Sequence, residues 1–265
     1  MNYVAAGNTN VGQARDHNED DLLVDPDHGV FVVADGMGGH DGGEIASALA
    51  IKAFKTTLAA FDDPEATAPW NFDLNKSSDE NLINGCIQWA NMEIHDASLA
   101  KLIAKYGNDV DLTRMRNLMG TTVVALRVGG ERVTYGHVGD SRIYRLTNGA
   151  LVRVTKDHSA VQDLVDSGVG TEDEVQRKMP GIKNIITKAC GLKLELDVPV
   201  ATLVPEVGDV FLLCSDGLSN EVTDSDIAIM LGMDRDPAEI VDLLIAKANI
   251  GGGKDNITAV VVKIG

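Results

Sequence analysis

The sequence predicts an α+β fold in which β-sheets pack together and helices cover them from outside. Short apolar runs rich in Val and Ile dominate both ends of the 265-residue chain, and such runs are typical of buried strands. Two long segments with apolar residues at helical spacing interrupt the strands, and further helical patterns come late. This order, without a periodic repeat, favours sheets that share a core with the helices outside.

Nine apolar runs predict the strands, and they lie near residues 2–8, 21–25, 30–34, 121–128, 131–138, 142–146, 197–203, 209–214 and 257–263. Five helical patterns lie at about 43–61, 79–104, 159–167, 223–231 and 237–249. The polar stretch 62–79, which contains Pro64 and Pro69, predicts an exposed loop. No shift in composition marks a linker, so we expect a single domain over residues 1–265.

The composition argues against several classes of protein. The 40 acidic and 23 basic residues give a formal net charge of −17, which disfavours a nucleic-acid partner because phosphate backbones repel such a surface. No apolar run approaches the roughly 20 residues of a membrane span, and the N-terminus MNYV lacks a signal core, so we expect no membrane association and a cytoplasmic location. The three cysteines have neither CxxC spacing nor an Arg six residues later, which disfavours a zinc site, a disulfide framework and a cysteine phosphatase.

Four aspartates share one sequence context, because each adjoins a predicted apolar strand. Asp35 and Asp216 each precede a glycine at the end of such a run, in VFVVADG and VFLLCSDG. Asp140 follows VTYGHVG in the same manner, and Asp255 comes just before the final strand. Carboxylates held at the ends of adjacent strands repel one another strongly unless a cation neutralises them. Because Mg²⁺ and Mn²⁺ prefer oxygen ligands, the pattern indicates a divalent metal site.

The glycine-rich stretch after Asp35 allows other interpretations. Asp-Gly after a strand is also a common turn signal, so a single such pair would indicate only a turn. A phosphate-binding loop needs Gly-Lys-Ser/Thr, which does not follow Gly39, and GMGGHDGG has the wrong spacing for GxGxxG. Gly36 lacks a side chain, which lets its backbone carbonyl approach a metal closely. A metal site therefore explains the repeated pattern better than a nucleotide cradle.

Seven motifs follow one another along the chain in the order RDHNED, VADGMGGHDGGEIAS, MGTT, GHVGDSRIYRL, DHS, LLCSDGLSN and GGKDNIT. In this order they resemble the metal-dependent Ser/Thr protein phosphatases (the PPM, or protein phosphatase 2C-like, family), and most of all its compact bacterial members. The resemblance extends from Arg15 to Thr258. It implies a sandwich of two antiparallel β-sheets flanked by helix pairs, in α-β-β-α layers, which agrees with the elements predicted above.

The resemblance also implies the metal ligands. Asp35 matches the carboxylate that bridges two metal ions, and the carbonyl of Gly36 would ligate the second ion. Asp216 and Asp255 would complete the protein ligands of the first ion. Asp20 matches the acidic residue that holds metal-bound waters.

A third ion and the catalytic chemistry follow from the same resemblance. Asp140 matches a residue that binds a third, weaker ion together with Asp216, and Arg15 matches the phosphate-binding arginine. The implied catalytic residues are therefore Arg15, Asp35 and Asp216. The implied reaction is hydrolysis of phosphoserine and phosphothreonine on proteins by a hydroxide between two tightly bound Mn²⁺ or Mg²⁺ ions. The expected partners are phosphorylated proteins and a cognate Ser/Thr kinase that the enzyme counteracts in signalling, and we expect a monomer.

Two positions depart from the family pattern. Met37 stands where eukaryotic members often have a general-acid His; bacterial members commonly have Met there, so the proton donor to the leaving group stays unassigned. His40 is close in sequence, but a lone loop histidine is more often structural or solvated. In the flap expected at about 157–190, Met179 precedes Pro180 where bacterial relatives often have His-Pro, which leaves substrate preference open.

Other functions fit the residues less well. A phosphoprotein-binding module on the same fold is one alternative, but every expected acidic position is filled. The DxD of LLVDPDHG, at Asp25 and Asp27, is similar to that of aspartyl-phosphate phosphatases, but Gly29 stands where they need Thr or Val. A calcium-binding loop would need an acidic residue at its end, which is missing. The predicted function is therefore a metal-dependent phosphatase.

Overall fold

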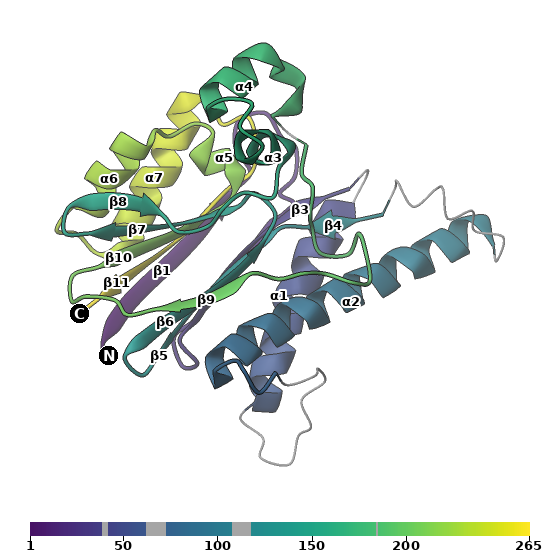
Figure 1. The fold of residues 1–265 in the computed structure, drawn as a ribbon, viewed down its shortest axis with the longest axis horizontal. Coiled ribbons are helices and arrows are strands. Elements are labelled where there is room, and N and C mark those ends of the chain that lie inside the picture. The colour runs from purple at the N-terminus through teal and green to yellow at the C-terminus, as the bar shows by residue number, and fades with distance from the viewer. Residues whose placement is uncertain (39–41, 62–72, 108–117, 184) are drawn as a thin grey trace.

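The protein contains two antiparallel β-sheets packed face to face (Figure 1). A computed structural model describes residues 1–38, 42–61, 73–107, 118–183 and 185–265. The five-stranded sheet has the order β1 (Tyr3–Asn10), β11 (Ile257–Ile264), β10 (Val210–Cys214), β7 (Arg142–Thr147) and β8 (Ala150–Arg153). The six-stranded sheet has the order β2 (Asp20–Asp25), β3 (Val30–Met37), β5 (Val123–Gly129), β6 (Arg132–Val138) and β9 (Val200–Leu203), with β4 (Gly120–Thr121) paired to the end of β3.

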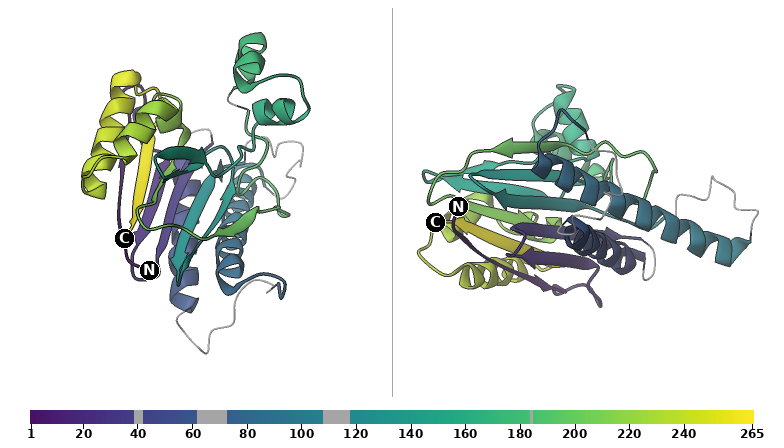
Figure 2. Two further views of the ribbon diagram at one scale, coloured as in Figure 1. Left: turned by 60° about the vertical axis from the view of Figure 1, so that its left-hand side comes forward. Right: turned by 90° about the horizontal axis from the view of Figure 1, so that it is seen from below.

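A pair of helices covers the outer face of each sheet (Figure 2). The helices α1 (Gly42–Phe61) and α2 (Ser78–Tyr106) pack on the six-stranded sheet, whereas α6 (Asp224–Leu231) and α7 (Pro237–Gly251) pack on the five-stranded sheet. Side-chain caps fix two of the helix starts: Ser77 and Glu80 form a capping box on α2, and Asp236 caps α7. The α-β-β-α layers confirm the predicted architecture.

Strand β3 contributes to two of the three apolar cores. Val30 and Val32 pack with the helices α1 and α2, whereas Phe31 and Val33 pack between the two sheets. Both faces of the strand are therefore buried, which explains why its sequence is continuously apolar rather than alternating. The apolar run ends at Ala34, so the next residues of the chain, beginning with Asp35, lie where the strand leaves the core.

Several predicted element boundaries were wrong. The predicted strand 121–128 is divided at Thr122 into β4 and β5, and the strand predicted at 197–203 begins only at Val200. Strand β8 was not predicted, nor was helix α4 (Glu172–Lys178), whose seven residues include one buried side chain, that of Val175. So polar a helix has no apolar periodicity, and its one signal is the capping box formed by Thr171 and Glu174. Of the predicted loop 62–79, residues 62–72 lie outside the described residues.

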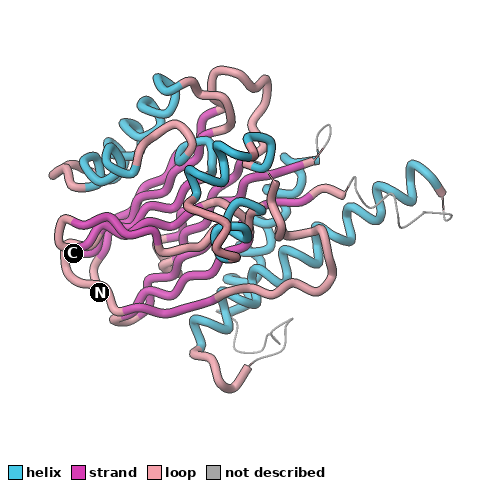
Figure 3. Tube along the Cα trace, turned by 45° about the horizontal axis from the view of Figure 1, so that its top comes forward, coloured by secondary structure: helices cyan, strands magenta, loops and turns pink. Residues whose placement is uncertain are grey.

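The expected flap contains three short helices between β8 and β9. These are α3 (Ala160–Asp166), α4 and a 3₁₀ turn, η2 (Pro180–Ile182). They lie at the top of the molecule in Figure 1, apart from both helix layers, and Figure 3 turns this end towards the viewer. Among the described residues, no helix combines the length and apolar character needed to cross a membrane.

Candidate active site

Asp20 and Asp35 come together through the register of two neighbouring strands. Asp20 begins β2, Asp35 lies near the end of β3, and the two residues are direct partners in the antiparallel pairing. Like charges directly opposite each other on antiparallel strands destabilise the pairing. The fold therefore places two carboxyl groups in a position that calls for a proton or a cation between them.

Three more aspartates from separate elements face the same place. Asp216 begins the four-residue helix α5 (Asp216–Ser219) directly after β10, Asp255 precedes β11, and Asp140 follows β6. Burial first, and then the charges of Asp20, Asp216, Asp140 and Asp255, raise the pKa of Asp35 well above its usual range. These carboxyl groups are therefore close enough for their charges to act on Asp35. Asp216 differs from expectation in one respect, since it begins a helix rather than ending the strand.

The pKa shifts of the other carboxyl groups have the same origin. Burial raises the pKa of Asp20 to about 7, with further contributions from the charges of Asp216 and Asp255. Burial and the charge of Asp216 raise the pKa of Asp140 to about 7. The pKa of Asp216 is raised by burial and then by Asp255. A raised pKa means that the negatively charged form of each carboxyl group is unfavourable in this site. A bound cation would supply the positive charge that stabilises the ionised carboxylates.

The donor set fits hard cations bound partly through water. Within the described ranges, no three His, Cys, Asp or Glu side chains are arranged to ligate one ion directly. Mg²⁺ usually keeps several waters and takes only one or two carboxylates from the protein, so direct ligation by three is not needed. Asp140 Oδ1 is buried without a hydrogen-bond partner in the described part of the chain. Such an oxygen is costly unless a cation or an ordered water satisfies it.

Hydroxyl groups that were not predicted from the sequence orient the carboxylates. Ser215 and Thr258 donate hydrogen bonds of 2.8 and 2.6 Å to Asp20 Oδ2. Thr122 Oγ1 accepts a 3.1 Å bond from the Asp35 backbone N–H and lies 2.7 Å from Ser141 Oγ. The sequence signal was the presence of Ser141 and Ser215 beside aspartates in GDS and CSDG, and of Thr258 three residues after Asp255 in DNIT, whereas Thr122 in MGTT has no aspartate beside it. Their role could be assigned only once the partner strands were known.

The backbone at Gly36 approaches its neighbours closely. A Cβ atom at Gly36 would lie 2.1 Å from the carbonyl oxygen of Gly43 and 2.5 Å from that of Glu19. No other residue fits without moving the backbone, so the glycine is required by packing. Its N–H donates to the Glu19 carbonyl at 3.1 Å, which fixes the peptide beside Asp35. Because Gly36 has no side chain, a metal ion can approach its carbonyl oxygen closely.

Arg15 lies at the edge of the cluster. Its guanidinium donates to Asp255 Oδ2 at 2.8 Å, and its side chain is 48% exposed. The hydrogen bond with Asp255 is the main cause that raises the pKa of Arg15 further above its usual range. Arg15 is therefore a fixed positive charge within reach of both the carboxylates and solvent. Met37 lies at the end of β3, and His40 lies outside the described residues.

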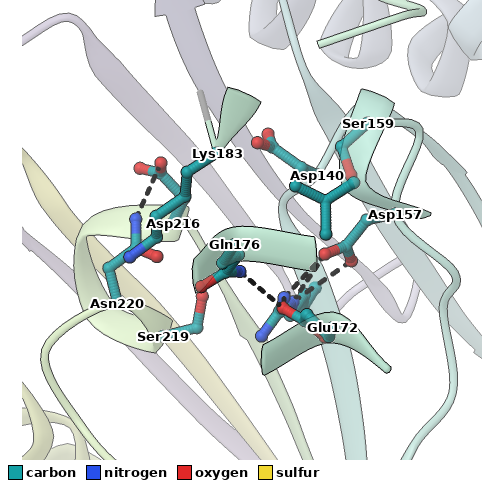
Figure 4. Close-up of a pocket in the computed structure, with 11 residues that line it drawn as sticks. Asp140, Asp157, Ser159, Glu172, Gln176, Lys183, Asp216, Ser219 and Asn220 are labelled. Atoms are coloured by element: carbon teal, nitrogen blue, oxygen red, sulfur yellow. Dashed lines mark hydrogen bonds and ion pairs between the residues drawn. The ribbon is translucent and has the colours of Figure 1, made fainter. Parts of the chain in front are cut away.

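A polar pocket joins the carboxylate cluster to the flap (Figure 4). Asp140, in the turn after β6, and Asp216, at the start of α5, contribute to its wall on one side, and Glu172, Gln176 and Lys183 contribute from the flap. The charge of Lys183 offsets part of the rise that burial causes in the pKa of Asp216. The three cysteines do not take part, because all are buried and burial raises the pKa of each thiol to about 12.

Comparison with known proteins identifies the family. The sequence pattern of protein phosphatase 2C matches residues 11–235. The chain is 34% identical to the serine/threonine phosphatase Stp of Listeria welshimeri over 96% of this chain and 93% of that protein. The solved structure of the serine/threonine phosphatase PstP/Ppp of Mycobacterium tuberculosis is similar with a TM-score of 0.77 and 31% identity, covering 99% of this chain and 98% of that one.

A second similar structure contains metal ions. It is the catalytic domain of the phosphatase PstP in complex with 2 manganese ions, and it has a TM-score of 0.76 and 32% identity, covering 98% of this chain and 97% of that one. The family match covers more than half of the chain, and the relatives are matched over nearly their full length. The chain therefore belongs to the protein phosphatase 2C family and is a metal-dependent protein serine/threonine phosphatase.

Proposed function

We propose that Asp35, Asp216, Asp255 and the Gly36 carbonyl would hold two divalent cations at the carboxylate cluster. Because no three of the described carboxylates are arranged to ligate one ion directly, part of this binding would be through water, and Asp20 would hold such bound waters. The observation that carries this proposal is the convergence of carboxyl groups from separate elements on Asp35. The buried Asp140 Oδ1, which lacks a hydrogen-bond partner within the described ranges, fits the same charge pattern.

The chemistry divides between the cations and the side chains of the chain. When bound, paired divalent cations lower the pKa of a water and neutralise charge, which supplies a hydroxide nucleophile near neutral pH. Asp20 orients waters at the cluster, because its Oδ2 is held by two hydroxyl donors and its orientation is thereby fixed. Asp35 lies at the centre of the site, where the charges of the other four aspartates act on it. The proton donor to the departing Ser or Thr oxygen is not assigned to a residue.

Arg15 binds the phosphate of the substrate in this proposal. Its planar guanidinium matches two phosphate oxygens, and it stays charged at every physiological pH. In the structure it pairs with Asp255. Ligation of a cation by Asp255 would reduce the hold of this carboxylate on Arg15. Because the Arg15 side chain is half exposed, it can then turn towards a phosphate that enters from solvent.

The wider features of the proposal follow from the same site. Asp140 and Asp216 border one pocket, and we assign to them a third, more weakly held cation. Both Mn²⁺ and Mg²⁺ suit a site made of oxygen ligands. The substrates are phosphorylated proteins, and a cognate Ser/Thr kinase supplies them. A single domain over 1–265 with the flap at 157–190, a cytoplasmic location and a monomeric state complete the proposal.

Hydrolysis of a phosphothreonine peptide tests the proposal directly. Activity should require added Mn²⁺ or Mg²⁺, disappear with EDTA and return when the metal is restored. The Asp216→Asn variant should lose turnover and should also bind fewer Mn²⁺ ions by calorimetry. Full activity of the metal-free protein would overturn the mechanism, whereas tight peptide binding without turnover would favour a phosphoprotein-binding module.

A further inference from the structure

The turn that carries Asp140 has little conformational freedom. Gly139, just before it, has a φ of 104°, and a Cβ atom there would lie 2.6 Å from the Thr122 side chain. On the other side, Ser141 Oγ lies 2.7 Å from Thr122 Oγ1. The backbone on both sides of Asp140 is therefore constrained by its neighbours, and the position of its carboxylate depends on what holds this turn.

His158 holds both polar backbone groups of Gly139. The Gly139 N–H donates to His158 Nδ1 at 3.1 Å, and the His158 N–H donates to the Gly139 carbonyl at 2.9 Å. His158 stands two residues before helix α3, at the start of the flap. Its own carbonyl accepts a 2.8 Å bond from the N–H of Thr187, at the end of the flap. One residue therefore joins both ends of the flap to the Asp140 turn.

The geometry determines the tautomer of two stacked histidines. Nδ1 of His158 accepts from a backbone N–H, so its proton is on Nε2. Nε2 of His137 lies 2.8 Å from the Lys156 carbonyl, which can only accept, so His137 also carries its proton on Nε2. The two rings stack with centroids 4.7 Å apart and planes 7° apart. Burial lowers the pKa of His158 to about 4, which keeps the ring neutral and Nδ1 free to accept.

We propose that His158 is a positioning residue that couples the flap to the Asp140 turn, so that the arrangement of the flap sets the affinity of the third-cation site. This inference rests on the proposed role of Asp140 in holding that cation. Because coupling between two sites is reciprocal, a cation bound at Asp140 should also order the flap through the same hydrogen bonds. Substrate access and the weak metal site would then be linked.

The test replaces the ring nitrogen that accepts from Gly139. In His158→Asn the side-chain oxygen lies close to the position of Nδ1, so this acceptor is retained. In His158→Gln the oxygen lies near the position of Nε2, so the acceptor is lost. His137→Gln is the matched control, because it alters the same ring stack while keeping a donor to the Lys156 carbonyl. Thermal unfolding of each holoenzyme verifies that the variants are folded.

Two measurements distinguish positioning from a general structural role. Calorimetry with Mn²⁺ should show that His158→Gln retains the two tightly bound ions. The affinity of its third-cation site for Mn²⁺ should fall about tenfold or more, the usual cost of losing a partner that orients a ligand. Amide hydrogen exchange at Gly139 and Thr187 should be slowed by Mn²⁺ in the wild type but not in His158→Gln. His158→Asn and His137→Gln should resemble the wild type in both measurements.

Each other outcome has a definite meaning. Wild-type behaviour of His158→Gln would overturn the inference. Equal defects in His158→Asn and His158→Gln would also overturn it, because ring packing rather than the bond to Gly139 would then matter. Asp140→Asn separates this failure from that of the proposed function: if this variant binds all cations as the wild type does, the third-cation assignment is wrong. If that happens, hydrogen exchange still tests the coupling. Exchange at Gly139 and Thr187 that is the same in His158→Gln as in the wild type would overturn the coupling as well.

Discussion

Asp20 and Asp35 lie directly opposite each other in the antiparallel pair formed by β2 and β3. Neutral groups hold each of them, since Ser215 and Thr258 donate to the Asp20 carboxylate, whereas Thr122 Oγ1 accepts from the backbone N–H of Asp35. The fold therefore keeps two like charges together at the cost of folding stability in the absence of cations. An arrangement of this kind, costly without a ligand, is typical of functional sites.

Asp20→Asn should stabilise the metal-free protein. The substitution removes one of the two opposed charges while keeping an oxygen that can accept from Ser215 and Thr258. We expect a gain of about 1 kcal/mol or more, seen as a rise in Tm of about 2–4 °C in EDTA. Asp27→Asn, in the exposed turn between the same strands, is the control and should leave Tm unchanged. A lower Tm for Asp20→Asn in EDTA would contradict the repulsion.

The stability of the protein should depend on pH in opposite directions with and without Mn²⁺. Folding raises the pKa of Asp20 and Asp140 to about 7, above the ~4 of an unfolded Asp. Their stabilising contribution in EDTA is therefore fully present below about pH 4 and lost as the pH rises through 7. Mn²⁺ binds the ionised carboxylates, so the stability it adds should grow over the same range.

The difference between Tm with and without excess Mn²⁺, measured at pH 5.5 and pH 8, checks this prediction. At a Mn²⁺ concentration of 100 times the Kd, binding adds about 2.7 kcal/mol to the free energy of unfolding. We expect most of this gain at pH 8 and little at pH 5.5. An equal gain at both values would show that the carboxylates do not bind protons and Mn²⁺ in competition.

Arg15→Ala should raise KM for a phosphopeptide. A hydrogen bond to a charged group contributes about 1.5–3 kcal/mol, so KM should increase about 10- to 100-fold. Lys254→Ala is the matched control, because Lys254 is an exposed cation next to Asp255 in the chain but pairs with Glu221. Steady-state kinetics of both variants decide the matter. If KM changes equally in the two variants, Arg15 acts only as one of several surface cations and does not bind the phosphate specifically.

Asp140→Ala should lower kcat while the two tight ions stay bound. Asp140 is not a partner of Asp35 in the strand register, and the proposal gives it only the weaker third ion. Mn²⁺ calorimetry beside phosphopeptide kinetics separates the two effects. The assignment of Asp140 would be wrong if the variant kept the wild-type kcat or lost all metal binding.

Lys183→Ala should affect large substrates more than small ones. Lys183 belongs to the flap and lines the same pocket as Asp216, so a peptide bound there would contact it. The expected increase in KM for a phosphopeptide is about fivefold, the effect of an exposed ionic contact of about 1 kcal/mol. KM for p-nitrophenyl phosphate should stay the same. Lys178→Ala, in the same flap, is the control, and equal effects on both substrates would argue against a peptide contact.

Much of the site could be predicted from the sequence, because the signal is local. Asp35, Asp140 and Asp216 each follow an apolar run within one or two residues, and a buried strand or its end holds such residues rigidly wherever the strand lies. The sandwich was predictable for a similar reason, since apolar runs and helical periodicity report which elements are buried. Strand β8 and helix α4 lacked this signal, because few of their side chains enter the core.

The partners of these residues were decided only by the tertiary structure. Arg15 and Asp255 are 240 residues apart in the chain, Thr258 reaches Asp20 across 238, and His158 reaches Gly139 from beyond a complete hairpin. Hydrophobic periodicity shows that a residue is buried, but not which strand lies beside it. Strand order, register and the packing of one sheet on the other determine that. The sequence by itself therefore determined which carboxyl groups lie at the ends of buried strands, whereas the fold determined what orients them, because orientation depends on neighbours that only packing brings together.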